Sequence, residues 1–167
     1  MGLYEARKFV AESYAENDLI GKQLLIAYLV SKGHVIKEET FDEDYGIDIV
    51  TEHDGQRYLF EVEMKDKYDF TDEESFPFET VSFLGRKEKW KTRKYFYCII
   101  STKTKAAIFC DSDTIFNEEY KQVIHIETYN RQGLDSFYRV PKELCQFREP
   151  KDFYKKNHKE IWGELTN

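Results

Sequence analysis

Three ionisable residues fall on two predicted strands at spacings that suit hydrolytic chemistry. Asp48 lies within GIDIVTE, and Glu63 and Lys65 lie at the end of RYLFEVEMK. Asp54-Gly55, between these segments, is a strong signal for a two-residue turn, so we expect an antiparallel hairpin. Carboxylates and a lysine on neighbouring strands are suited to holding a divalent cation and orienting water beside it.

The alternation of side chains in this hairpin separates apolar from charged residues. The turn pairs Glu52 with Arg57, and continuing the register sets Asp48 opposite Glu61. We expect a core face formed by Ile47, Ile49, Thr51, Tyr58, Phe60, Val62 and Met64. The opposite face carries Asp48, Glu61, Glu63 and Lys65. Like charges this close are unfavourable without compensation, which a divalent cation would supply.

The expected cation is Mg²⁺. Magnesium prefers oxygen donors, takes one or two carboxylates, and keeps water and substrate phosphate oxygens as its other ligands. Lys65 beside it would orient the attacking water. The charged face is therefore suited to phosphodiester hydrolysis.

Asp48, followed by Glu63-Met64-Lys65 at the end of the next strand, resembles the PD-(D/E)XK nuclease superfamily. The resemblance covers roughly residues 16–100 and includes a helix before the hairpin. It implies a restriction-endonuclease-like central mixed β-sheet flanked by helices, with Mg²⁺ or Mn²⁺ as cofactor. It also implies Asp48 and Glu63 as metal ligands, the carbonyl of Met64 as a further ligand, and Lys65 as the water-activating group. Ile47 stands where the family's namesake proline would sit.

Two parts of the pattern stay open. Glu61-Val62-Glu63 offers an E-x-E variant in which Glu63 takes the lysine's place. We favour Glu63 with Lys65 because a lysine is available, and keep Glu61 as an auxiliary carboxylate. Many relatives also supply a glutamate from the first helix, and the candidates here are Glu16, Asp18 and Gln23.

A basic segment downstream is a candidate nucleic-acid surface. The run RKEKWKTRK, residues 86–94, holds six basic residues, one acidic residue and one tryptophan. Lysine and arginine neutralise phosphates, while tryptophan stacks on bases or packs on sugars. The expected contacts are Arg86, Lys87, Lys89, Trp90, Lys91, Arg93 and Lys94. The alternative is a solvated helix with Trp90 as a core anchor.

Composition and charge bound the class of protein. With 41% hydrophobic and 16% aromatic residues, the chain is able to form one domain over residues 1–167. No apolar run is long enough to cross a bilayer and the N-terminus is too charged for a secretory signal, so we expect a cytoplasmic protein with no membrane partner. The three cysteines lack zinc-site or disulfide spacing, and no glycine-rich phosphate loop predicts a nucleotide cofactor.

The net charge of −7 is divided unevenly along the chain. Residues 1–85 carry 8 Lys/Arg and 20 Asp/Glu, whereas residues 86–167 carry 17 and 12. This division indicates an acidic site in one half and an anion-facing surface in the other.

Hydrophobic periodicity changes at Gly33, from a helical spacing before it to strand alternation after it. We expect one or two helices, then strands in HVIKE, GIDIVTE, RYLFEVEMK, TVSFL, YFYCIIS, AAIFCD, QVIHIET and FYRV, then a helical tail near residues 151–163. This order predicts an α/β or α+β domain with a central mixed sheet.

The leading hypothesis is a metal-dependent DNA endonuclease. Cleavage of both strands by so small a chain favours a homodimer with twofold-related sites. The alternative is a noncatalytic module that keeps a nuclease-like fold and binds nucleic acid or protein.

Overall fold

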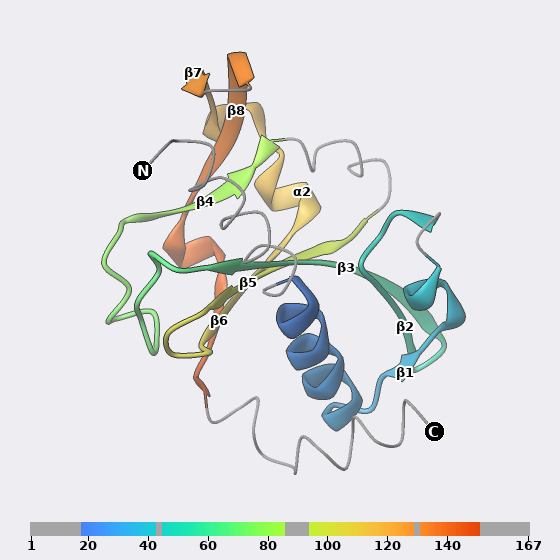
Figure 1. Ribbon diagram of the computed structural model, residues 1–167. Coiled ribbons are helices and arrows are strands. Elements are labelled where there is room, and N and C mark those ends of the chain that lie inside the picture. The colour runs from blue at the N-terminus through green and yellow to red at the C-terminus, as the bar shows by residue number, and fades with distance from the viewer. Residues whose placement is uncertain (1–17, 43–44, 86–93, 129–130, 151–167) are drawn as a thin grey trace, which may run out of the picture.

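The structure is a computed structural model that describes residues 18–42, 45–85, 94–128 and 131–150. It has three layers (Figure 1). A six-stranded mixed sheet lies in the middle. A helix over residues 18–31 covers one face, and a three-stranded antiparallel sheet packs on the other. The fold is therefore mixed α/β, as the order of predicted elements indicates.

The middle sheet has the order β1-β2-β3-β5-β6-β9. Its strands are β1 (Val35–Ile36), β2 (Ile49–His53), β3 (Gln56–Lys65), β5 (Phe96–Ser101), β6 (Ala107–Asp111) and β9 (Gln146–Arg148). β3 and β5 run parallel, while every other neighbouring pair runs antiparallel. A parallel pair cannot be joined by a tight turn, so the chain leaves this sheet between β3 and β5.

The β2–β3 hairpin has the predicted register. Glu52 lies opposite Arg57, and Val50 lies opposite Leu59. The turn residues Asp54 and Gly55 have φ angles of 51° and 75°, the left-handed values that a type I′ turn requires at both central positions.

The helix over residues 18–31 ends at the predicted glycine stop. The amide of Gly33 donates to the carbonyl of Val30, and that of His34 donates to Leu29, both at 3.0 Å. With Gly33 at a φ of 94°, this is a Schellman motif, which satisfies the last helical carbonyls.

The second sheet has the order β4-β8-β7, with β4 (Thr80–Leu84), β7 (Lys121–Thr128) and β8 (Arg131–Pro141). β4 pairs only with residues Phe137–Pro141 of β8, so β7 and β8 continue beyond it as a two-stranded ribbon that projects at the top of Figure 1. β8 begins at Arg131 rather than at Phe137, because pairing with β7 draws polar and glycine residues into the strand. The chain also forms the short α-helix α2 (Ser112–Ile115) and the short 3-10 helices η1 (Glu38–Phe41), η4 (Glu118–Tyr120) and η5 (Lys142–Leu144).

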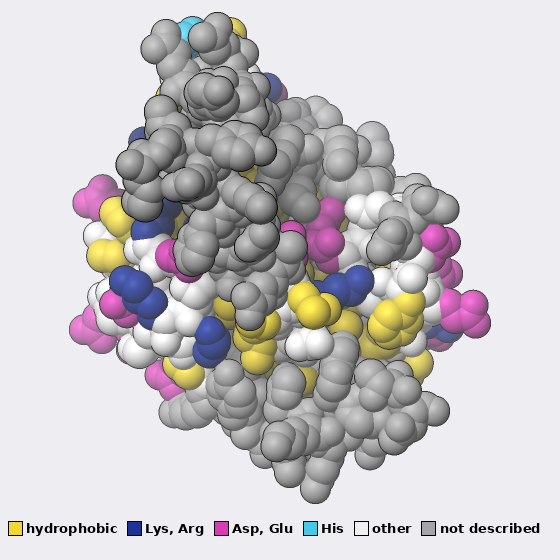
Figure 2. Space-filling model, viewed as in Figure 1, with side chains coloured by type: hydrophobic (Ala, Val, Ile, Leu, Met, Phe, Trp, Pro, Cys, Tyr) yellow, Lys and Arg dark blue, Asp and Glu magenta, His cyan; other side chains and the backbone are white. Residues whose placement is uncertain are grey.

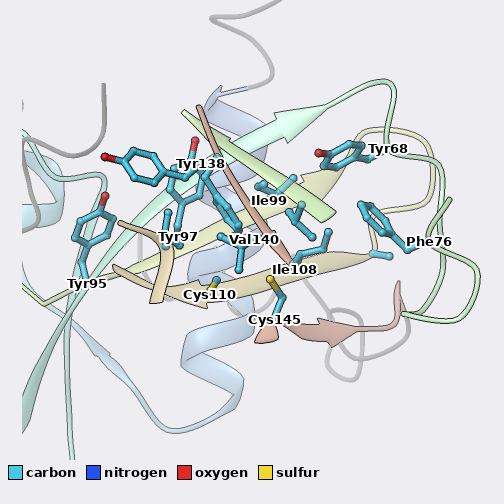
Figure 3. Close-up of a cluster of buried hydrophobic side chains, with 14 of the residues drawn as sticks. Tyr68, Phe76, Tyr95, Tyr97, Ile99, Ile108, Cys110, Tyr138, Val140 and Cys145 are labelled. Carbon is cyan, nitrogen blue, oxygen red and sulfur yellow. The ribbon is translucent and has the colours of Figure 1, made fainter. Parts of the chain in front are cut away.

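Both faces of the middle sheet are buried, in two separate clusters. On the helix side, Phe60, Val62 and Met64 of β3 pack with the buried side of the helix. On the other side, shown in Figure 3, residues of β5 and β6 pack with β4 and β8. Ile47 was predicted to lie with Ile49 but belongs to this second cluster, because it precedes β2 and strand alternation does not extend to it.

Within the described ranges, no helix has the length and apolar character needed to span a bilayer. The predicted helical tail near residues 151–163 and most of the basic segment lie outside the described residues.

Candidate active site

Asp48 lies immediately before β2, and its carboxylate, rather than a backbone carbonyl, accepts the next hydrogen bond from β3. Its Oδ2 accepts a hydrogen bond of 3.0 Å from the amide of Val62 on β3. The half-buried side chain also lines a pocket of about 380 Å³ that includes Lys22, Thr40 and Gly46. The carboxylate is therefore fixed against the middle of β3 and remains reachable from outside.

Glu63 lies one residue beyond this contact, on the face of β3 that the second sheet covers. Its Oε2 accepts a hydrogen bond of 2.5 Å from the hydroxyl of Tyr97 on β5. Tyr97 is fully buried, and its ring is seen edge-on within the cluster of Figure 3. Burial, and then the charge of Glu63, raise the pKa of Tyr97, so its hydroxyl stays protonated and acts as a donor.

Lys65 follows on the same face and is held by β4. Its Nζ donates to the carbonyl of Ser82 at 2.7 Å and lies 4.6 Å from the centre of the Tyr68 ring. The hydroxyl of Tyr68 in turn accepts from the amide of Ser82 at 3.0 Å. Burial lowers the pKa of Lys65, and the nearby charge of Glu63 opposes this shift.

The structure places Glu63 and Lys65 on the same face of β3 and holds the Asp48 carboxylate against the same strand. The amide that holds Asp48 belongs to Val62, the residue directly before Glu63, and Lys65 is two residues further on. Figure 2 shows that acidic, basic and apolar side chains alternate over the exposed surface of this view. Two carboxylates and an amine in this arrangement are chemically suited to binding a hard cation and orienting water.

Glu61, the predicted auxiliary carboxylate, has a different environment. Its side chain is only 1% exposed, whereas those of Glu63 and Lys65 are half-buried. The charge of Glu61 acts on Tyr95, whose pKa is raised first by burial and then by this carboxylate. Because a reacting group must be reachable, the difference in exposure favours Glu63-Met64-Lys65 over the E-x-E alternative.

The helix contributes different residues to the site than the sequence suggested. Asp18 is exposed, Gln23 is half-buried, and Glu16 lies outside the described residues. Gly21 is the helical residue packed against β3, with its Cα beside the side chain of Met64, which points into the helix-side core. Lys22 follows it, donating to the carbonyl of Thr40 at 2.8 Å and lining the pocket that Asp48 enters.

Within the described ranges, no group of three or more His, Cys, Asp or Glu side chains is arranged to hold a metal ion. Any cation at this site would therefore rely on two carboxylates, with water, backbone or substrate oxygens completing its ligands.

Of the predicted nucleic-acid contacts, only Lys94 lies within the described residues. Its side chain is exposed and its Nζ lies 3.9 Å from a carboxylate oxygen of Asp113. Arg86, Lys87, Lys89, Trp90, Lys91 and Arg93 lie outside the described residues.

Sequence reasoning missed the residues that hold Glu63 and Lys65 in place, which are Tyr97, Tyr68 and Ser82, and it missed Lys22 in the pocket that Asp48 lines. Tyr97 reaches Glu63 only because β5 runs parallel to β3, and Ser82 reaches Lys65 only because the second sheet folds over the first. Neither relation leaves a local sequence signal.

Comparisons with models of protein families, with curated proteins and with solved structures give no match for this chain.

Proposed function

We propose that the protein is a metal-dependent nuclease of the PD-(D/E)XK type that hydrolyses DNA phosphodiester bonds as an endonuclease. The observation that carries this proposal is the hydrogen bond between Asp48 Oδ2 and the amide of Val62. It fixes one carboxylate beside the residue that precedes Glu63, on the strand that also carries Lys65. Glu63 and Lys65 follow Val62 on one face of β3, so all three charged side chains are attached to or carried by this strand.

The donor set fits a small, hard cation. Asp48 uses Oδ2 for the Val62 amide, and Glu63 uses Oε2 for the Tyr97 hydroxyl. Among the described residues, the second oxygen of each carboxylate has no hydrogen-bond donor, so each has one oxygen for a ligand. Together with the carbonyl of Met64, they would hold Mg²⁺ or Mn²⁺, which needs few protein ligands. The bound cation would supply Lewis-acid stabilisation of charge on the phosphate oxygens.

Lys65 would orient the attacking water. Its ammonium is positioned by the Ser82 carbonyl and the Tyr68 ring, so the side chain has little freedom to turn away. A positioned donor of this kind contributes by holding the nucleophile in line with the bond to be broken.

The layered α/β fold is compatible with a restriction-endonuclease-like domain, because the mixed sheet carries the charged residues on β3 and the helix packs behind them. Cleavage of both strands of a duplex would require two such sites, which a homodimer would provide.

The test is cleavage of plasmid, linear duplex, branched and single-stranded DNA in Mg²⁺, in Mn²⁺ or in EDTA. We expect metal-dependent cutting that falls at least about a hundredfold in Asp48→Asn and in Lys65→Met. Matched controls are Asp69→Asn and Lys103→Met, which change exposed residues of the same types. These controls should cut like the unaltered protein.

Two outcomes would contradict the proposal. Metal-dependent cutting that survives both Asp48→Asn and Lys65→Met would mean that another site is responsible. Cutting of no substrate, together with no heat of Mn²⁺ binding in calorimetry, would instead favour the noncatalytic binding module.

A further inference from the structure

A second pocket opens on the opposite side of the middle sheet, beside the C-terminal end of the helix. Its volume is about 230 Å³, and five of its lining residues are Tyr28, Tyr58, Phe60, Phe96 and Phe109. They come from the helix and from β3, β5 and β6. The pocket is therefore walled by aromatic rings from four separate elements.

The rings of this pocket offer flat faces to a ligand. Phe60 and Phe96 are stacked with centroids 5.7 Å apart, and Tyr58 lies 6.3 Å from Phe96. Tyr58 and Phe96 are only half-buried, so part of each ring faces solvent. Partly exposed aromatic faces of this kind bind the π-face of a planar ring, as in proteins that stack nucleobases.

Two permanent cations lie at the edge of these rings, Lys32 and Arg148. The Nε of Arg148 donates to the Tyr28 hydroxyl at 3.2 Å, which fixes the guanidinium over the pocket wall. Within the described part of the chain, neither cation forms an ion pair, and no lining residue is acidic. The same two cations also line a neighbouring pocket that contains Asp72, Glu73 and Glu149, so they favour an anion on the aromatic side, where the lining holds no carboxylate.

The adjacent end of the helix does not cancel this preference. Helical carbonyls at a C-terminus repel anions, but here the amides of Lys32, Gly33 and His34 already donate to them. Among the residues that line this pocket, Lys32 and Arg148 therefore supply the charge that faces a ligand.

We propose that this pocket binds a mononucleotide unit, with its base against Tyr58 and Phe96 and its phosphate at Lys32 and Arg148. The rings supply the stacking surface, and the cations pair with the phosphate, which a neutral aromatic ligand lacks. No glycine-rich phosphate loop is involved. The pocket lies on the opposite face of the sheet from Glu63 and Lys65, so the inference does not depend on the proposed cleavage.

The probe is AMP, titrated into the full chain by calorimetry in EDTA, so that no cation-bridged binding at Asp48 contributes. Adenosine lacks the phosphate and ribose 5-phosphate lacks the base. We expect AMP to bind at least about tenfold more tightly than either, because both halves of the pocket are used.

Two substitutions separate the halves. Phe96→Leu keeps apolar volume but removes a ring, so it should weaken AMP binding about tenfold. It should also weaken the binding of adenosine more than that of ribose 5-phosphate. Arg148→Gln removes a charge at the rim, and should weaken AMP about fivefold with little change for adenosine. Lys67→Gln, which removes the charge of an exposed residue outside the pocket lining, is the matched control.

The proposal is overturned if AMP produces no binding heat, if it binds no better than adenosine, or if neither substitution weakens it. If circular dichroism shows that Phe96→Leu does not fold, the AMP affinity of Arg148→Gln alone tests the proposal. A 5′-phosphorylated trinucleotide identifies the source: binding equal to that of AMP assigns the end of a strand, and binding only of AMP assigns the free nucleotide.

Discussion

The two faces of β3 use the same strand for opposite purposes. On the helix side, Phe60, Val62 and Met64 are uniformly apolar and buried. On the other side, Leu59 is apolar but Glu61, Glu63 and Lys65 follow it beneath the second sheet. The helix can cover a face that needs only packing. On the charged face, the second sheet supplies the Ser82 carbonyl as an acceptor for Lys65, and β5 supplies the Tyr97 hydroxyl as a donor to Glu63. These hydrogen bonds offset the cost of placing charged groups beside the core.

The contrast shows that the charged face of β3 is the one expected to lower the stability of the fold. Ionisable groups beside a core destabilise a protein unless their hydrogen-bonding needs are met. On the helix-side face, Phe60, Val62 and Met64 of β3 carry no charge, so this stretch requires packing but no hydrogen-bond partners. Substitutions at matched positions on the two faces should therefore have different consequences.

The largest effects are expected at Ile99 and Ile100, neighbouring residues of β5 that are fully buried on opposite faces. Changing either to alanine removes buried methyl and methylene groups and should cost about 2–5 kcal/mol of unfolding free energy in urea titrations. Ile99 lies opposite Glu63 in the ladder, so Ile99→Ala should also weaken Mn²⁺ binding, whereas Ile100→Ala should not. Equal Mn²⁺ affinity in the two folded variants would remove the distinction between the faces.

A similar comparison applies to two glycines. At Gly85, a Cβ would lie 2.4 Å from the backbone oxygen of Ser136 and 1.9 Å from its Oγ, so Gly85→Ala should cost about 3 kcal/mol. At Gly21, the nearest atom would be Cγ of Met64 at 3.0 Å. Met64 is flexible and alanine favours the helix, so Gly21→Ala should change stability by less than about 1 kcal/mol. Thermal and urea unfolding of both variants checks the ranking, and a larger loss at Gly21 would reverse it.

Tyr97→Phe tests how the charged face is held in place. Removing the hydroxyl leaves Glu63 without its buried donor, and loss of such a supporting contact commonly weakens metal binding 10- to 100-fold, so we expect a change of about that size for Mn²⁺. Tyr95→Phe is the control, because Tyr95 interacts with the charge of Glu61 instead. Calorimetric Mn²⁺ affinities that are unchanged in Tyr97→Phe would show that this hydrogen bond serves only packing.

The smallest effect is a pH dependence at the edge of the helix-side face. Burial, and then the neighbouring His53, lower the pKa of His34 from 6.5, while Asp54 opposes the shift. The unfolded chain therefore binds this proton more readily, and folded-state stability falls as pH drops below about 6.5 until the folded-state pKa is passed. His34→Asn should reduce the difference between unfolding free energies at about pH 7.5 and about pH 5, and His125→Asn, at an exposed position, should not.

The hairpin was predictable because its information is local. Asp54-Gly55 determines the turn, the turn determines the register, and the register brings Asp48 to β3. The stop at Gly33 and the strands β4, β5 and β6 follow from equally short patterns. The function itself stays a prediction.

What the sequence does not encode locally is which layers meet. The parallel pairing of β3 with β5 and the placement of β4 in a separate sheet depend on the whole set of strands. That is why Tyr97 and Ser82 were missed, and why the burial of Glu61 beneath the second sheet has no local signal. Ile47 was assigned to the wrong side for a related reason, since β2 starts only at Ile49.

The parallel pairing also sets the order in which the site assembles during folding. Asp48 and Val62 are 14 residues apart and meet within a hairpin, which closes in microseconds. Glu63 and Tyr97 are 34 residues apart, and they meet only when β5 docks beside β3 after the intervening chain has crossed to the other sheet. Loop closure of this kind is slower, so we expect the first carboxylate to be in position before the second gains its tyrosine.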